Sequence, residues 1–158
     1  MIQSKVEIVP FEPHLREHFY TLNAAWLQKH FVIEPIDEQV LREPEQAVLE
    51  PGGAIFFARL GDLVIGTCAL LHEAPGIYEL SKMAVDEACR GQGAGRLLLD
   101  AAIAEFHRRR GHTLFLESSS ILKPALHMYE QAGFVLQPTI RAGSHYARAD
   151  VYMIYAPK

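Results

Sequence analysis

The stretch KMAVDEACRGQGAGRLLLDAA, residues 82–102, joins a strand-like run to a leucine-rich run through a turn with glycine at every second position. Its special residues are Arg90, Gly91, Gly93, Gly95 and Arg96. Glycine is unfavourable at the start of a helix unless the backbone needs a positive φ angle or a close neighbour. A strand that turns into a helix N-terminus offers N–H groups and the positive helix end to an anion. The stretch therefore predicts a phosphate-binding loop rather than a tight turn without a ligand.

Two familiar phosphate motifs do not fit this spacing. A P-loop ends in Gly-Lys-Ser/Thr, but here Gly95 is followed by Arg96 and Leu97. A dinucleotide fingerprint needs glycine or alanine at position 96, and it follows the first strand of its fold, whereas this stretch follows the fourth predicted strand. The spacing that remains is Arg90-x-x-Gly93-x-Gly95.

Strand and helix patterns alternate along the rest of the chain. Strands are predicted over residues 5–11, 77–85, 113–119, 134–140 and 149–156, and two more lie within 54–73, joined by a Gly61-Asp62 turn. Helices are predicted over residues 12–31, 36–49 (interrupted by Pro44), 96–112 and 119–134. Only the strand–helix–strand unit of residues 77–118 demands a parallel crossover. The fold class is therefore mixed α/β with α+β character, built on a mixed sheet.

Two of these helices carry explicit end signals. In the helix of residues 96–112, the predicted buried stripe is Leu98, Leu99, Ala102, Ile103 and Phe106. Glu105 and Arg109 should pair along it, and Gly111 should end it in the left-handed conformation. In the helix of residues 119–134, Ser119 or Ser120 is the expected N-cap, Pro124 lies early, and Gly133 is the expected stop.

Length and composition suit one domain over residues 1–158. The net charge of −4, with 22% charged residues, argues against broad electrostatic binding of nucleic acid. No uncharged run is long enough to cross a bilayer, so no membrane partner is expected. Neither cysteine, Cys68 or Cys89, has a metal-type spacing, and His14 and His18 lack an apparent third ligand, so we expect no metal and a cytoplasmic location.

The loop in its context resembles the GNAT superfamily of N-acetyltransferases, whose pyrophosphate loop reads Arg/Gln-x-x-Gly-x-Gly/Ala. The later segment ALHMYEQAGF, residues 125–134, is similar to the family's Ala-x-x-x-Tyr-x-x-x-Gly-Phe helix. The resemblance is close over residues 54–136 and covers residues 1–53 only in element order. It implies a single N-acetyltransferase domain. Its mostly antiparallel sheet would have six to seven strands, about four flanking helices, and a splay between strands 4 and 5.

The resemblance also implies a site for acetyl-CoA as cosubstrate. Pantetheine would pair with the backbone of the fourth strand, and the pyrophosphate would rest on loop N–H groups. The implied cofactor-binding residues are Met83, Ala84, Val85, Arg90, Gly91, Gln92, Gly93, Ala94, Gly95 and Arg96. Many family members carry an asparagine near pantetheine where this chain has Leu122, and Ser119 or Ser120 could replace it.

Two residues match catalytic positions of the family. Tyr129 falls on the tyrosine that lies near the thioester sulfur, as a general acid or a hydrogen-bond donor; the alternative is an aromatic residue of the buried stripe. Glu79 lies eleven positions before Arg90, the spacing at which histone-acetylating members carry a catalytic glutamate. It could be the general base, could hold the acceptor's ammonium group, or could be a strand carboxylate facing solvent.

The resemblance implies acetyl transfer to a primary amine, with a small molecule as the expected acceptor. The alternatives are a protein lysine or N-terminus as acceptor, and a CoA-binding sensor without turnover. Both Tyr129 and Glu79 are present, which favours catalysis. Family members often form dimers, so a homodimer is the oligomeric state that the resemblance suggests. Candidate acceptor residues are Trp26, Phe31, Glu34, Arg141, His145 and Tyr146, although core packing is the favoured interpretation of Trp26 and Phe31.

Overall fold

The computed structural model describes residues 5–144 and 146–157, and a seven-stranded mixed sheet forms its centre. The strands are β1 (Val6–Pro10), β2 (Ala54–Leu60), β3 (Leu63–Ala74), β4 (Ile77–Val85), β5 (Thr113–Ser118), β6 (Phe134–Leu136) and β7 (Val151–Tyr155). Their order across the sheet is β1-β2-β3-β4-β5-β7-β6. All neighbours pair antiparallel except β4 and β5, which pair parallel through the predicted crossover.

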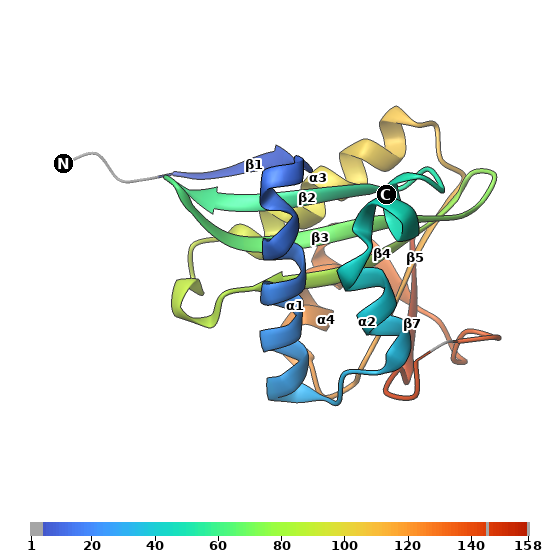
Figure 1. Ribbon diagram of the computed structural model, residues 1–158. Coiled ribbons are helices and arrows are strands. Elements are labelled where there is room, and N and C mark those ends of the chain that lie inside the picture. Colours follow the sequence, from blue (N-terminus) through green and yellow to red (C-terminus); the bar gives the residue numbers. More distant parts are fainter. Residues whose placement is uncertain (1–4, 145, 158) are drawn as a thin grey trace.

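Helices cover both faces of the sheet (Figure 1). The α-helices are α1 (Arg16–His30), α2 (Pro35–Arg42), α3 (Ala94–Arg108) and α4 (Lys123–Ala132), and the short turns are η1 (Pro13–Leu15), η2 (Glu45–Leu49) and η3 (Glu87–Cys89). In Figure 1, α1 and α2 lie in front of the sheet, whereas α3 and α4 lie behind it. The fold class, the strand number and the mixed topology predicted from the sequence are confirmed.

Each face of the sheet has its own apolar core, because apolar residues alternate along the strands and point to both sides. On one face, Leu98, Leu99 and Phe106 of α3 pack against β2, β3 and β4. On the other face, Phe19 of α1 and Leu41 of α2 pack against the opposite side of the strands. The active-site candidates lie where β4 passes between these two layers.

A β-bulge interrupts β4 in its second half. Thr67 of β3 pairs with Ala84 and Ala69 pairs with Ser81, so two residues of β4 lie opposite one residue of β3. Lys82 within the bulge has a φ angle of 53°, which is a left-handed conformation that side-chain-bearing residues rarely adopt. Pairing between β4 and β5 ends at Glu79. The two strands therefore separate beyond Glu79, which is the splay that the family resemblance predicted.

The end of α3 differs from its prediction. The predicted buried stripe is confirmed except that Ile103 is half-buried, and Glu105 accepts a hydrogen bond from Arg109 Nε at 2.6 Å. The left-handed residue after the helix is Arg110, with φ 55°, rather than Gly111. Gly111 is needed for space, since a Cβ there would come within 2.2 Å of the Phe106 ring.

The cap of α4 also differs from its prediction. Leu122 occupies the N-cap without a side-chain hydrogen bond, so neither serine caps the helix. Ser120 instead donates its hydroxyl to Asp150 at 2.6 Å. Pro124 in the first turn and Gly133 as the left-handed stop are confirmed.

The strand predicted over residues 134–140 is shorter than expected, because β6 ends at Leu136. Pro138 follows two residues later and has no N–H group to donate to a further ladder bond. Within the described ranges, no helix is long and apolar enough to cross a membrane.

Candidate active site

A cavity of about 230 Å³ lies where β4 and β5 separate. Its walls come from α1, β4, β5, α4 and the segment before β7. The lining residues are Asn23, Trp26, Leu27, Phe31, Glu79, Leu80, Ser81, Lys82, Met83, Ala84, Val85, Arg90, Gly95, Leu116, Glu117, Ser118, Ser119, Leu122, Ala125, Met128, Tyr129, Tyr146, Arg148 and Ala149. Both predicted catalytic residues line this cavity, together with the predicted cofactor residues Met83, Ala84, Val85, Arg90 and Gly95. The other predicted loop residues are not among its lining residues: Gly91, Gln92, Gly93, Ala94 and Arg96.

The glycine loop is the part of the cavity's surroundings that is expected to hold the pyrophosphate. Gly91 and Gly93 have φ angles of 85° and 80°, and a Cβ on either would meet no atom within 4 Å. These glycines are therefore required by backbone conformation and leave the loop surface bare. Gly93 is the N-cap of α3, and no side chain caps the first-turn N–H groups. Uncapped N–H groups at a helix N-terminus suit a pyrophosphate.

The two arginines of the loop differ in placement. Arg90 lines the cavity and is exposed. Arg96 donates from Nε to Asp100 at 2.9 Å, one turn along its own helix. Its backbone N–H lies in the first turn of α3, among the N–H groups that no side chain caps.

The bulged half of β4 is the part that is expected to hold pantetheine. Met83, Ala84 and Val85 all line the cavity. They lie beyond the last residue of β4 that pairs with β5, so one edge of their backbone faces the slot. An exposed strand edge can pair with an extended amide-containing chain, as pantetheine is. The uncapped helix end and this free edge together fit acetyl-CoA.

Tyr129 is placed on α4 beside the slot. Its ring packs against Phe134 at 6.1 Å between centroids, and it also lines the cavity. Packing and function are thus compatible at this residue. Burial raises the pKa of Tyr129 to about 12, and the nearby Cys68 thiol adds to the rise. The phenol therefore stays protonated over the whole physiological range and can donate a hydrogen bond into the slot.

Glu79 lies at the point where the two strands part, and it is only 5% exposed. This burial excludes one of the three roles considered for Glu79 from the sequence, that of a strand carboxylate facing solvent. The pKa of Glu79 is raised to about 8, first by burial and then by the carboxylates of Glu73 and Glu117, while Arg141 offsets part of the rise. A carboxyl group with this pKa exchanges protons near neutral pH, as a general base must.

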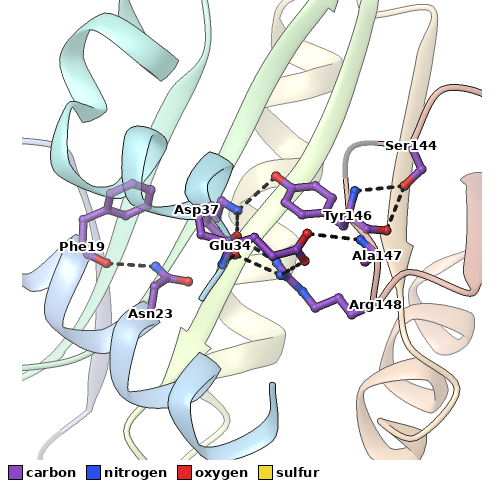
Figure 2. A network of polar contacts seen from close by, with 9 residues as sticks. Phe19, Asn23, Glu34, Asp37, Ser144, Tyr146, Ala147 and Arg148 are labelled. Atoms are coloured by element: carbon purple, nitrogen blue, oxygen red, sulfur yellow. Dashed lines mark hydrogen bonds and ion pairs between the residues drawn. The ribbon is translucent and has the colours of Figure 1, made fainter. Parts of the chain in front are cut away.

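A buried ionic network lies beside the cavity (Figure 2). It includes Glu34 and Tyr146, two of the predicted acceptor residues, so this side is called the acceptor side of the cavity. Lys82 Nζ donates to Asp37 Oδ1 at 2.7 Å and to Tyr146 Oη at 3.0 Å. Arg148 donates to both Asp37 oxygens, at 2.8 and 2.9 Å, and to Glu34 at 2.8 Å. Burial alone would raise the pKa of Asp37, but hydrogen bonds from Arg148 and Lys82 outweigh it and lower that pKa to about 2. The network is therefore fully charged at neutral pH.

The other predicted acceptor residues are placed as follows. Trp26 and Phe31 line the cavity while packing against the α1 and α2 core. Arg141 lies over the Phe115 ring at 4.3 Å and about 4.0 Å from Glu117. His145 lies outside the described residues. Of the two serines considered as replacements for the family's asparagine, Ser119 lines the cavity, whereas Ser120 is bonded to Asp150.

Metal binding finds no support in the described part of the chain, where no three His, Cys, Asp or Glu side chains are grouped for it. His14 has only Glu12 as a nearby partner, at 3.8 Å.

Sequence reasoning missed four residues that line the cavity, namely Asn23, Lys82, Glu117 and Arg148, and it missed Asp37, which bonds Lys82 and Arg148. One signal was available for Asp37. Glu34 and Asp37 form a reciprocal capping box with Pro35 at the start of α2, which explains why an acidic residue lies there. Nothing local indicates that its carboxylate is also the partner of residues 45 and 111 positions away.

Comparisons with known proteins show the family and the fold of this chain. The sequence model of the acetyltransferase (GNAT) family matches residues 14–134. No curated protein sequence matches the chain. Among solved structures, the chain is similar to a GNAT-family acetyltransferase from Staphylococcus aureus Mu50, with a TM-score of 0.84, 18% identity, and coverage of 95% of this chain and 98% of that one.

Two further structures extend the comparison. An acetyltransferase from Streptococcus agalactiae 2603 has a TM-score of 0.83 and 17% identity, covering 96% of this chain and 98% of its own. A protein from Salmonella typhimurium, solved with its cofactor acetyl-CoA, has a TM-score of 0.72 and 18% identity, covering 94% of this chain and 91% of its own. At these identities the likeness establishes a shared fold.

Proposed function

The chain belongs to the acetyltransferase (GNAT) family and is an acetyl-CoA-dependent acyltransferase, and from this premise we propose that it acetylates the primary amine of a small molecule. The observation that carries the choice of a small acceptor is the wall on the acceptor side of the cavity. Tyr146 and Arg148 are bonded across the slot to Lys82 and Asp37. A cavity walled in this way suits a small amine better than a protein segment, which needs an open groove.

Charge around the cavity supports an amine as acceptor. Arg90 lies on the cofactor side, and the charges of Lys82 and Arg148 are balanced within their own network. Glu79 and Glu117 are the carboxylates that line the acceptor side. Buried carboxylates favour a cationic group beside them. The proposed acceptor therefore arrives as an ammonium ion.

Glu79 is the proposed base for this ammonium ion. An amine with a pKa near 10.4 is neutral in roughly one molecule out of 2,500 at pH 7, so removal of its proton limits the reaction. A carboxylate with a pKa of about 8 accepts a proton more readily than an ordinary glutamate does. The proposal gives Glu79 two successive roles, contact with the ammonium group and acceptance of its proton, directly or through a water molecule.

Tyr129 is the proposed partner of the leaving sulfur. Transfer of a proton from a phenol with a pKa of about 12 to a thiolate whose acid has a pKa near 8.5 is uphill by roughly 5 kcal/mol. Tyr129 would therefore stabilise the developing thiolate by a hydrogen bond rather than by complete proton transfer. Acetyl-CoA supplies the acetyl thioester, and the free edge of β4 would hold its pantetheine arm straight in the slot.

An acceptor screen tests the proposal. The protein is incubated with acetyl-CoA and a panel of small amines, diamines and amino sugars, alongside lysine-containing and free N-terminal peptides, and release of free thiol is recorded. We expect at least one small amine to be acetylated with a higher kcat/KM than any peptide. Turnover of peptides alone would transfer the proposal to protein acetylation. Cofactor binding without turnover of any acceptor would favour a CoA sensor.

Location and assembly remain proposals. Both cysteines, Cys68 and Cys89, are free thiols, in agreement with a reducing compartment such as the cytoplasm. The homodimer suggested by the family resemblance stays a prediction that sedimentation analysis would test.

A further inference from the structure

Asp37 is a fully buried carboxylate that joins three segments of the chain. It lies in the first turn of α2, and its side chain has no exposed area. Its two oxygens accept hydrogen bonds from Lys82 Nζ, from two nitrogens of Arg148, and from the backbone N–H of Glu34. Four donors satisfy a carboxylate almost completely. Asp37 is therefore fixed in one position and can fix its partners in turn.

The first partner is the bulge of β4. Lys82 holds a φ angle of 53°, although a left-handed conformation is unfavourable for any residue with a Cβ atom. Such a conformation persists only where surrounding contacts determine it. Those contacts are the ion pair with Asp37 at 2.7 Å and the face of the Tyr146 ring at 4.5 Å. The Lys82 side chain is only 4% exposed, so water cannot replace them.

The bulge in turn shapes the cofactor slot. It lies between Ser81 and Ala84, where the register between β3 and β4 shifts by one residue. The three residues that follow Lys82 are those that present a free backbone edge to the cavity. A displacement of Lys82 would therefore displace this edge.

The second partner is the segment that walls the acceptor side. Figure 2 shows Arg148 extending toward the carboxylates of Asp37 and Glu34, with Tyr146 from the same segment beside them. Glu34 also accepts a hydrogen bond from the backbone N–H of Ala147 at 3.3 Å. The segment from Tyr146 to Ala149 is thus attached to the start of α2 by the same carboxylate that holds the bulge.

We infer that Asp37 is a positioning residue for acetyl transfer, which holds the cofactor edge through Lys82 and the acceptor wall through Arg148. The inference rests on the acetyltransferase function proposed above. Asp37 itself is not among the residues that line the cavity. Its carboxylate sets the distance between the cofactor edge and the acceptor wall. Reactions between two bound groups are sensitive to displacements of about 1 Å.

Stability alone would not require this arrangement. A buried ion pair can often be replaced by uncharged residues of similar volume with little loss of stability, whereas removal of one partner alone is strongly destabilising. This difference separates a positioning role from a purely structural one. The variant Asp37→Asn leaves Lys82 with an uncompensated charge, whereas the double variant Asp37→Asn/Lys82→Met removes one charge of each sign.

The experiment compares these variants with the wild type and with Glu38→Gln as a matched control. Glu38 is the next residue of α2, but its carboxylate bonds Tyr20 and Arg42 on the side away from the cavity. Three quantities are measured: the melting temperature, the Kd for CoA, and kcat with the acceptor, small amine or peptide, that the screen identifies. Hydrogen exchange over residues 81–85 and 146–149 gives a further measurement that needs no acceptor.

We expect Asp37→Asn to lower the melting temperature and the double variant to recover most of it. In the double variant, kcat should remain about 100-fold below the wild type. Hydrogen exchange should remain faster in both segments, while the Kd for CoA changes less than about threefold because the glycine loop is intact. Glu38→Gln should change none of these quantities.

Recovery of kcat together with the melting temperature would overturn the inference, as would unchanged exchange in the double variant. If Asp37→Asn does not fold, the double variant and Tyr146→Phe, which removes only the hydroxyl bonded to Lys82, decide the question by the same criteria. Tyr146→Phe should lower kcat by about tenfold at an unchanged melting temperature, and an unchanged kcat would count against the inference. Failure of the wild type to acetylate any small amine would instead contradict the proposed acceptor class, and leaves the exchange measurement valid.

Discussion

The glycine loop and the acceptor wall are two halves of one site, yet they are built in opposite ways. The loop offers main-chain groups that neighbouring residues place, with Gly91 and Gly93 in the left-handed conformation and α3 beginning directly after them. The acceptor wall depends on buried charged side chains, in which Asp37 meets Lys82 and Arg148 across 45 and 111 positions of sequence.

This difference shows why one half can be recognised and the other cannot. A backbone site needs a short run of residues with suitable conformational freedom, and such a run can be read directly. A side-chain network needs only that residues of opposite charge arrive at the same place, which any fold can arrange in many ways. The predictions below test whether the two halves are as independent as this contrast suggests.

The largest effect should come from the loop. Gly93→Glu forces a left-handed residue with a Cβ and places a carboxylate where the pyrophosphate is expected, so affinity for acetyl-CoA should fall by about 1,000-fold or more. The rise in melting temperature on addition of acetyl-CoA should disappear. Gly61→Glu is the matched control, because Gly61 has a φ angle of 63° and equally open surroundings in the β2–β3 turn. An intact thermal shift in Gly93→Glu would contradict the cofactor assignment.

The next effect should come from the slot between the halves. Tyr129→Phe removes the hydrogen bond proposed for the leaving sulfur, and kcat should fall by about 100-fold with little change in the Kd for CoA. Tyr155→Phe is the control, because both rings pack against Phe134 while the Tyr155 hydroxyl faces His107 at 3.2 Å. Steady-state kinetics with calorimetric binding would measure both quantities. Equal turnover in the two variants would exclude Tyr129 from the mechanism.

The acceptor wall should show itself in the acid stability of the protein. The pKa of Asp37 falls from an ordinary 3.8 to about 2 on folding, so its charged contacts stabilise the protein fully above pH 4. About 2 kcal/mol of unfolding free energy should be lost as the pH falls from 4 to 2. Urea unfolding at several pH values would measure this loss. Asp37→Asn should reduce the dependence of the unfolding free energy on pH between pH 4 and 2. Glu38→Gln, whose carboxylate is partly exposed, should change this dependence less.

The smallest effect should be a shift in pH dependence at the junction of the halves. Because Glu79 acts as a base only when ionised, kcat/KM should rise with pH and level off above about pH 8. Glu73→Gln removes one negative neighbour and should move this inflection to lower pH, and Glu79→Gln should abolish it. Glu50→Gln, on the exposed end of η2, is the control. If Glu79→Gln instead raises only the KM for the acceptor, the residue binds the ammonium group without acting as the base.

Much of the fold could be predicted because its signals are local. The Gly61-Asp62 turn, the break at Pro44 and the stop at Gly133 all depend on residues with unusual backbone freedom or restriction, and the structure confirms each. The errors have a common cause. The serine cap of α4 was wrong because Asp150, 30 residues away, takes the Ser120 hydroxyl and amide instead. The left-handed stop at Gly111 was wrong because Arg110 takes the left-handed conformation, and Gly111 instead leaves space for the Phe106 ring.

The sequence by itself determined the family and predicted the phosphate loop, Tyr129 and Glu79, because each of these predictions depends on a short stretch of sequence. Only the tertiary structure decided that Glu79 is buried with a raised pKa, that Lys82 adopts a left-handed conformation, and that Asp37 joins it to Arg148. The physical reason is that burial and charge pairing arise between segments that meet only when the sheet and its helices have assembled.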